Sequence, residues 1–211
     1  METVSRPVLV VDEGRCRANI ISMLERAQMA GVCFRPHFKT HQSELIGSWF
    51  RTAGIDRIAV SSVSMARTFA EDGWKDILIA FPLNFREMDD LRVLATKVRL
   101  GVLISCPEAG IMLPGRFSFP VSVYVKIDVG SQRTGFDPEE ASQLLALMKK
   151  ISEDPMLKIA GLLAHAGHTY HAKSIEEILQ IKDDGLTALS SLKHTLHPYF
   201  PDLDISWGDT P

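Results

Sequence analysis

The segment around Lys39 carries the residues best suited to covalent chemistry. It reads R-P-H-F-K-T-H over residues 35–41, so a lysine ends an apolar stretch with a histidine two residues to either side. An apolar environment and a neighbouring cation both disfavour the ammonium form of lysine, and the neutral amine is a nucleophile toward carbonyl carbon. The segment predicts Schiff-base chemistry at Lys39. The alternative is a surface lysine whose stem packs on apolar atoms.

His37 and His41 allow a second interpretation of this segment, as a metal site. On a helix, two histidines four residues apart share one face and can bind one ion. Pro36 and the apolar run before it favour extended backbone instead, where positions four apart lie roughly 13 Å from each other. A shared ion then requires a bend. A zinc hydrolase built from His37, His41, His165 and His168 is therefore a minor alternative.

A second motif, K-I-D-V-G-S-Q-R-T-G-F over residues 126–136, continues a strand-like run. Polar residues alternate with apolar ones in the run, and a turn flanked by glycines then presents Arg133. A guanidinium is a permanently charged donor fork that suits a phenolate or carboxylate oxygen. The alternative is a solvated arginine in an ordinary turn.

A third motif follows the apolar stretch that ends near Leu163. It reads H-A-G-H-T-Y-H, so three histidines and Tyr170 fall within the seven positions 165–171. These side chains offer aromatic stacking, hydrogen bonding and proton transfer. A zinc cluster is the competing interpretation, and it is weakened because the loop contains neither a cysteine nor an acidic residue.

The last motif is S-W-G-D-T-P over residues 206–211. Small residues after a strand allow backbone N–H groups to approach a phosphate, as they do after the late strands of (β/α) barrels. Gly208 and Thr210 suit such a cradle. Asp209 is a poor direct contact for an anion, so we expect it to orient neighbours or to accept a hydrogen bond from a backbone N–H.

Short β-rich runs alternate with amphipathic stretches along the chain, the rhythm of βα units. Apolar residues follow a helical period over 20–27 and 144–151, and helix starts are expected at Pro107, Pro138 and Ser174. The expected strands are mostly apolar on both faces, as buried strands are. They cover residues 8–11, 32–38, 57–60, 77–80, 98–104, 121–127, 157–163 and 203–206.

Eight strand signals separated by seven helical ones fit either a (β/α) barrel or a doubly wound sheet. Neither G-x-G-x-x-G nor G-x-x-x-x-G-K-[ST] follows a strand, which argues against dinucleotide and P-loop nucleotide sites. We therefore expect an α/β fold of the barrel type. Its reacting groups lie at the carboxyl ends of the strands, where all four motifs stand.

Composition narrows the class of protein further. The 211 residues are 45% hydrophobic, enough to bury a core, and the net charge of -3 gives no basic field for nucleic acid or an anionic membrane. No apolar run reaches the roughly 20 residues that span a bilayer, and the amino terminus lacks a secretory pattern, so we expect a cytoplasmic protein. The three cysteines form no C-x-x-C pair and predict neither disulfides nor a zinc ribbon.

Together the four motifs make the chain resemble the fold-type III pyridoxal-phosphate (PLP) enzymes, the alanine racemase N-terminal-domain superfamily. Within it, the chain is most similar to the D-threonine aldolase and D-serine dehydratase group. R-P-H-x-K-T-H is close to a signature of that group, and K-I-D-x-G-x-x-R-x-G is shared more widely. G-H-x-Y leans toward the dehydratases, and G-[SD]-T-P is the usual last phosphate motif. The motifs occur in the family's order, and the resemblance covers about residues 7–211.

This resemblance implies a role for each motif. Lys39 would form the internal aldimine with PLP, with His37 beside it at the cofactor. Arg133 matches the arginine at the phenolic oxygen, and Tyr170 matches a tyrosine near the ring nitrogen. His165 matches the histidine against the pyridine ring and would be catalytic together with Lys39. The phosphate cradle would comprise Gly208, Asp209 and Thr210, although serine is common in the family where this chain has aspartate.

The resemblance also implies a domain organisation. Residues 1–211 would form one PLP-binding domain, a (β/α)8 TIM barrel that is incomplete at its carboxyl end. The first strand, about residues 7–12, would pair with a carboxy-terminal β domain absent from this chain, which leaves seven barrel strands. That absent domain would carry the ligands for a divalent metal, Zn or Mn. We expect no metal site within the chain itself.

The implied activity is that of a PLP-dependent lyase, working as a homodimer on a small D-β-hydroxy amino acid. Retro-aldol cleavage and β-elimination are both open, because no residue here selects between them. One alternative is an amino-acid racemase of the same fold. The other is a non-catalytic PLP homeostasis or carrier protein, which fits the chain length but lacks R-P-H-F-K-T-H and G-H-T-Y.

Overall fold

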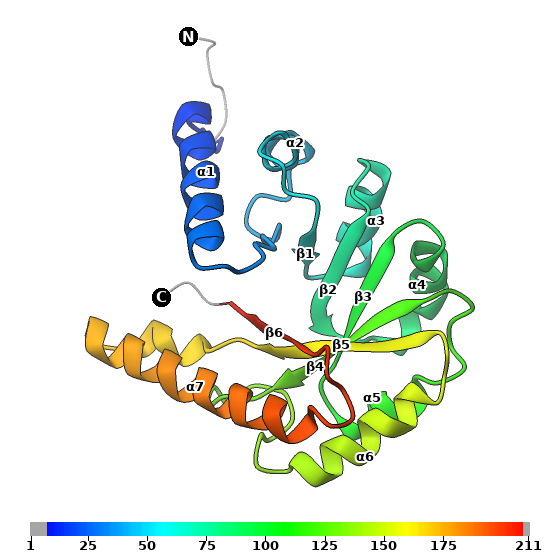
Figure 1. Cartoon of the computed structure of the whole chain (residues 1–211). Coiled ribbons are helices and arrows are strands. Elements are labelled where there is room, and N and C mark those ends of the chain that lie inside the picture. Colours follow the sequence, from blue (N-terminus) through cyan, green and yellow to red (C-terminus); the bar gives the residue numbers. More distant parts are fainter. Residues whose placement is uncertain (1–7, 209–211) are drawn as a thin grey trace.

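The computed structural model describes residues 8–208, in which six parallel strands form one curled sheet, a half-barrel (Figure 1). Neighbours in the sheet follow the chain order, β1 to β6. All five neighbouring pairs are parallel. The strands are β1 (Ile58–Val60), β2 (Asp76–Pro82), β3 (Arg99–Ile104), β4 (Val121–Ile127), β5 (Leu157–Ala164) and β6 (Asp204–Trp207).

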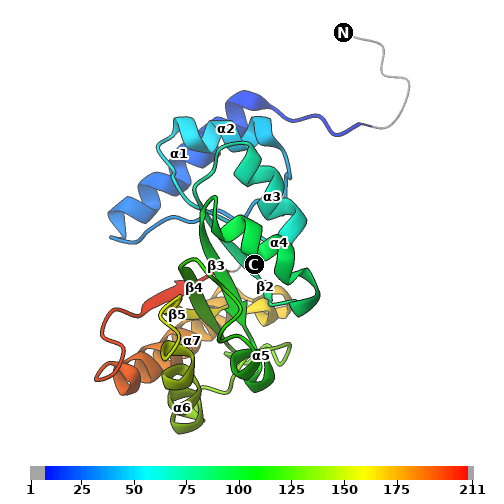
Figure 2. The same ribbon diagram turned by 90° about the vertical axis from the view of Figure 1, so that its right-hand side faces the viewer.

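Helices cover the outer side of the curl (Figures 1 and 2). Those of the described residues are α1 (Glu13–Met29), α2 (Glu44–Thr52), α3 (Val63–Glu71), α4 (Met88–Ala95), α5 (Pro107–Met112), α6 (Ala141–Ser152) and α7 (Ile175–Leu196), with two 3₁₀ turns, η1 (Phe85–Glu87) and η2 (Gly167–His171). Ser174 caps α7 by accepting from the Glu177 N–H, and Pro107 opens α5, as the sequence predicts. The helical periods over 20–27 and 144–151 are confirmed by α1 and α6.

Alternate strand residues face two apolar layers, because side chains in a strand point to opposite faces in turn. The outer layer, between sheet and helices, is the larger and includes most of the buried Ile, Val and Leu side chains. The inner layer fills the concave side, where Ala59, Leu78, Leu103, Tyr124 and Leu163 pack together. Strands β1 to β5 are therefore largely buried on both faces, which explains their nearly continuous apolar sequence, whereas β6 is only partly buried.

The predicted strand over 32–38 is wrong except for one bridge. His37 pairs in parallel with Ala59 of β1, through the Phe38 N–H to the Ala59 carbonyl and the Ala59 N–H to the Pro36 carbonyl. Pro36 has no N–H to extend the ladder. Beyond Phe38 the chain turns, since the Gln42 N–H donates to the Phe38 carbonyl at 3.0 Å. The barrel fold is confirmed, but residues 8–208 contain six strands rather than the seven or eight expected.

Pro138 does not begin a helix, because α6 starts three residues later at Ala141. The Asp137 side chain accepts from the Glu139 N–H, and the Asp137 carbonyl accepts from the Glu140 N–H. Those two bonds make Pro138 part of a turn that precedes the helix.

Residues 8–11, predicted as a strand, lie in none here, and Leu9 and Val10 are 89% and 83% exposed. Their expected partner is a domain outside this chain, so the pairing stays a prediction.

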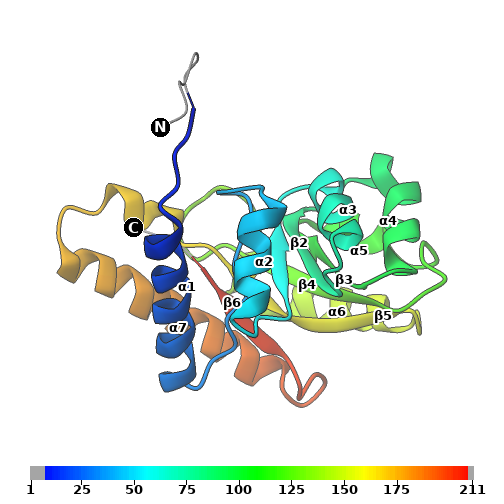
Figure 3. The same cartoon turned by 90° about the horizontal axis from the view of Figure 1, so that it is seen from above.

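Figures 1 and 3 place α1 and α7 on the same side of the molecule, the side on which β6 lies. Within residues 8–208, no helix combines the length and the apolarity needed to cross a membrane.

Candidate active site

Lys39 stands on a tight turn at the end of its bridge to β1, and its side chain is exposed. The Lys39 N–H donates to His37 Nδ1 at 3.2 Å, and its carbonyl accepts from Gln42 Nε2 at 3.2 Å. Gln42 adopts a φ of 47°, a left-handed conformation that closes the turn. Extended backbone through residue 41 is thus a wrong expectation. The turn instead fixes Lys39 on both sides and leaves its amine accessible.

The floor beneath this turn is aromatic. Phe38 is fully buried, and its ring centroid lies 4.8 Å from that of Phe69 and 5.2 Å from those of Phe50 and Trp74. The ring of His41 lies 4.5 Å from that of Phe38. The turn is therefore anchored by one deeply packed side chain immediately before the lysine.

His37 and His165 come together with Lys39. The pKa of His37 is lowered to about 4, first by burial and then by its electrostatic interactions with Lys39 and His165. Such interactions fall off with distance, so Lys39 and His165 both lie near His37. The first and third sequence motifs therefore meet at the carboxyl edge of the sheet.

His165 is held by the fourth motif. Its Nδ1 is hydrogen-bonded to the carbonyl oxygen of Gly208, immediately after β6. A carbonyl only accepts, so Nδ1 carries the proton, and Nε2 of the neutral ring is the acceptor. Asp209 and Thr210, the rest of the predicted phosphate cradle, lie outside the described residues.

The rest of the third motif reaches toward the second. The Tyr170 ring lies 6.0 Å from that of His165 and is 53% exposed. A side chain at Gly130 would come within 3.4 Å of His168 Nε2, so the His168 ring lies over the glycine turn of the second motif. These contacts place the 165–171 loop between the Lys39 turn and the turn that carries Arg133.

The second motif forms a turn built on Asp128. Asp128 Oδ1 accepts from the Gly130 N–H at 2.9 Å and the Gln132 N–H at 3.1 Å. Phe136 then bridges back to Ile127. Arg133, at the top of this turn, is exposed. The turn supplies an exposed guanidinium, while its contact with a phenolic oxygen stays a prediction.

Lys126 is a functional candidate to which the sequence reasoning gave no role. It is buried, 6% exposed, and its Nζ donates to the Ile127 carbonyl at 3.0 Å. Burial lowers its pKa, Asp128 raises it and Arg133 lowers it again. The signal in the sequence is alternation, because Tyr124, Lys126 and Asp128 fall two residues apart on the concave face. A buried lysine amine thus lies inside the half-barrel near Arg133.

The four histidines of the zinc interpretation, His37, His41, His165 and His168, do not share one environment. His41 stacks on Phe50, with centroids 5.8 Å apart, inside the aromatic floor. Within residues 8–208, no three His, Cys, Asp or Glu side chains gather closely enough to hold a metal ion.

Comparison with known proteins identifies the family to which the chain belongs. A model of the family described as "Alanine racemase, N-terminal domain" matches residues 11–197. The chain belongs to this family. Membership confirms the resemblance and the barrel type of fold.

Several relatives of this alanine racemase N-terminal domain are dehydratases. The chain is 29% identical over its whole length to a D-serine dehydratase of Dictyostelium discoideum, of which it covers 57%. It is 30% identical over 83% of its length to the D-threo-3-hydroxyaspartate dehydratase of Delftia sp. (strain HT23), of which it covers 47%. The chain thus spans about half the length of the curated relatives it matches.

Solved structures agree on the fold. The Delftia dehydratase superposes with a TM-score of 0.86 at 23% identity, over 97% of this chain and 60% of the other. A D-threonine aldolase from Filomicrobium marinum superposes with a TM-score of 0.84 at 24% identity, over 92% of this chain and 53% of the other.

The residues present fit PLP. Lys39 offers an exposed amine for an aldehyde, and the fixed His165 ring offers a flat aromatic surface for a pyridine. Arg133 offers an exposed cationic donor. This combination of amine, aromatic ring and cation matches the aldehyde, the ring and the oxygen anions of that cofactor.

Proposed function

We propose that this chain is the cofactor-binding half of a PLP-dependent lyase that acts on a D-β-hydroxy amino acid. One observation carries the proposal: Lys39 stands exposed on a fixed turn, next to His37 and near a His165 ring tethered to Gly208. The dehydratases and the aldolase among the relatives support this reaction class.

The residues of the chain divide the work at this site. PLP, when bound, supplies an electron sink for negative charge that develops at the substrate Cα. Lys39 provides the amine that attaches the cofactor. His165, held in a fixed orientation, would support the cofactor ring, with Tyr170 near the ring nitrogen. Arg133 would bind the phenolic oxygen, and Gly208 and Thr210 would hold the phosphate, with Asp209 orienting its neighbours in that cradle.

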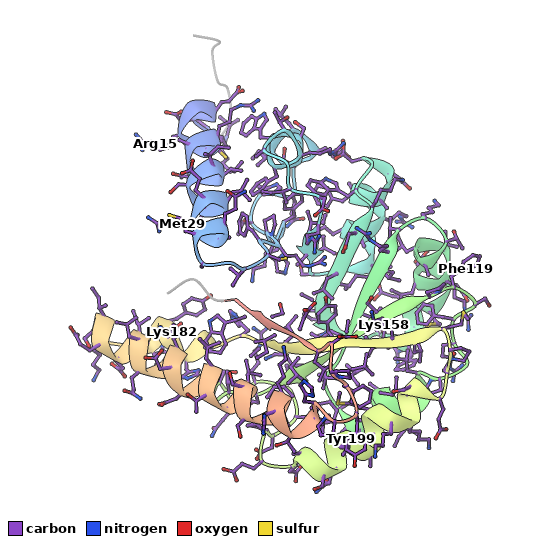
Figure 4. The ribbon with its side chains drawn as sticks, viewed as in Figure 1. Arg15, Met29, Phe119, Lys158, Lys182 and Tyr199 are labelled. Carbon is purple, nitrogen blue, oxygen red and sulfur yellow. The ribbon has the colours of Figure 1, made fainter. Side chains whose placement is uncertain are left out.

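The attachment is tested by adding PLP, reducing with borohydride and locating the adduct by peptide mass analysis. We expect one adduct, on Lys39, and none in a Lys39→Ala variant. Lys158→Ala is the matched control, because Lys158 is also exposed but is the second residue of β5, at the opposite, amino edge of the sheet (Figure 4). Labelling that persists in Lys39→Ala, or that Lys158→Ala reduces equally, contradicts the proposal.

The reaction class is tested with D-serine, D-threonine and D-threo-3-hydroxyaspartate on the full-length protein. A dehydratase releases ammonia and an oxo acid, whereas an aldolase releases glycine and an aldehyde. Interconversion of D- and L-alanine would favour the racemase, and cofactor binding without any turnover would favour the carrier.

The proposal includes three further expectations from the sequence. The enzyme is a homodimer, it is cytoplasmic, and a divalent Zn or Mn ion binds to residues outside this chain. Residues 1–211 form a single barrel domain whose first strand, about 7–12, pairs with that outside part. Light scattering and metal analysis of the full-length protein check the dimer and the metal.

A further inference from the structure

The two histidines that flank Lys39 make the same local contact. His37 Nδ1 accepts from the Lys39 N–H at 3.2 Å, and His41 Nδ1 accepts from the Ser43 N–H at 3.0 Å. In both cases the donor lies two residues further along the chain. This is the geometry of an Asx turn, in which a side-chain acceptor replaces a backbone carbonyl.

These contacts fix the protonation state of both rings. A backbone N–H only donates, so each Nδ1 must carry a lone pair, and the neutral ring then carries its proton on Nε2. A protonated imidazole has no acceptor. Both turns therefore exist only while His37 and His41 are neutral.

We propose that His37 and His41 are positioning residues whose neutral Nε2–H tautomers hold the turn that presents Lys39, and that protonation releases the turn. The pattern H-x-K-x-H thus encodes two side-chain acceptors, one before and one after the lysine. Neither histidine needs to touch substrate or cofactor for this role.

The surroundings of the rings maintain the neutral form. Burial lowers the pKa of both. The ionisable groups that lower the pKa of His37, after burial, are Lys39 on its own turn and His165 from the loop after β5. His41 contacts the rings of Phe38, Phe50 and Phe69, none of which is titratable.

The role of His37 beside Lys39 therefore differs from the one that its position in the sequence indicates. A histidine beside a lysine is expected to act as a cation that disfavours the ammonium form. With a pKa of about 4, His37 is uncharged at neutral pH and exerts no such effect. Its effect on Lys39 is geometric.

The experiment measures amide hydrogen exchange at Lys39 and Ser43 by NMR in the full-length protein without added PLP. Asparagine places Oδ1 near the position of Nδ1 and keeps the acceptor, whereas leucine removes it. We expect His37→Leu to speed exchange at Lys39 by about fivefold to tenfold and His37→Asn to leave it protected. His41→Leu and His41→Asn should do the same at Ser43, so each pair is the control for the other.

A pH series distinguishes the proposed role from a purely structural one, because a purely structural role would not make protection of the Lys39 N–H depend on the protonation of His37. The folded pKa of His37 lies below the ordinary value of 6.5, so the unfolded state binds a proton first as the pH falls. The contribution of His37 is complete above pH 6.5 and is lost toward about pH 4, and protection of the Lys39 N–H should be lost over the lower part of that range. His37→Asn should lack this step.

These measurements test the positioning role of His37 and His41 independently of the proposed function, because PLP is absent throughout. Unchanged protection in both leucine variants overturns the inference, and so does an identical pH step in His37→Asn. If a leucine variant fails to fold, the asparagine variant and its pH series still decide.

Discussion

The two edges of the half-barrel are stabilised in different ways. At the amino edge, charged side chains pair with each other: Arg35 Nη1 lies 2.7 Å from Asp76 Oδ1, and Arg99 Nη2 lies 3.4 Å from Asp76 Oδ2. At the carboxyl edge, side chains bind the backbone instead, with His37 and Asp128 each accepting from an N–H two residues on.

This difference explains where ligand chemistry is possible. Within residues 8–208, no carboxylate lies within ion-pair distance of Lys39 or Arg133. Turns closed through backbone contacts leave the cationic groups available, whereas the paired arginines of the amino edge are already satisfied. In barrels of this type the carboxyl edge carries function and the amino edge carries stability.

The largest effect is expected from filling a glycine at the carboxyl edge. Gly135 has a φ of 125°, and a Cβ there would lie 2.8 Å from the Asp128 nitrogen. Because this neighbour is backbone and cannot move aside, Gly135→Ala should lower the free energy of unfolding by about 3 kcal/mol. Chemical denaturation measures the change.

Gly115→Ala is the matched control for this prediction. Gly115 also has a positive φ, 77°, but a Cβ there would meet nothing within 4 Å. It should cost only about 1 kcal/mol, the strain of the conformation alone. Equal losses in the two variants would show that the close approach within the Arg133 turn contributes nothing.

An intermediate effect is expected at the amino edge. Asp76 is 17% exposed and neutralises two arginines, so Asp76→Ala should cost about 2 kcal/mol by leaving Arg35 partly buried without its partner. Labelling of Lys39 by PLP and borohydride should be unchanged while the protein is folded. Loss of that labelling at an unchanged fold would show that the two edges are coupled and would break the comparison.

The sequence predicts the carboxyl edge better than the amino edge. Each of the four motifs is local, and the residues that cap helices are read directly, as at Ser174 and Pro107. The Arg35–Asp76 pair joins positions 41 residues apart, and nothing local marks it. Burial of Lys126 can be read from alternation only once the concave face of β4 is known.

The turn at Lys39 shows a different limit. The apolar run and Pro36 predict extended backbone, and the chain turns because side-chain acceptors and the buried Phe38 fix an alternative conformation. Strand propensity is a weak preference, and several specific contacts together outweigh it. The local sequence pattern therefore identifies Lys39 but does not predict the side-chain contacts that fix its turn.

The smallest effect separates the two arginines that share Asp76. Arg99 is 71% exposed and its pair is solvated, so Arg99→Ala should cost about 0.5 kcal/mol or less. Arg35 is 19% exposed and also donates to the Ile58 carbonyl at 3.0 Å, so Arg35→Ala should cost about 2 kcal/mol. Denaturation in low and high salt measures both. If the two losses are equal, burial does not set the strength of this edge, and the amino edge is held by net charge rather than by the one enclosed pair.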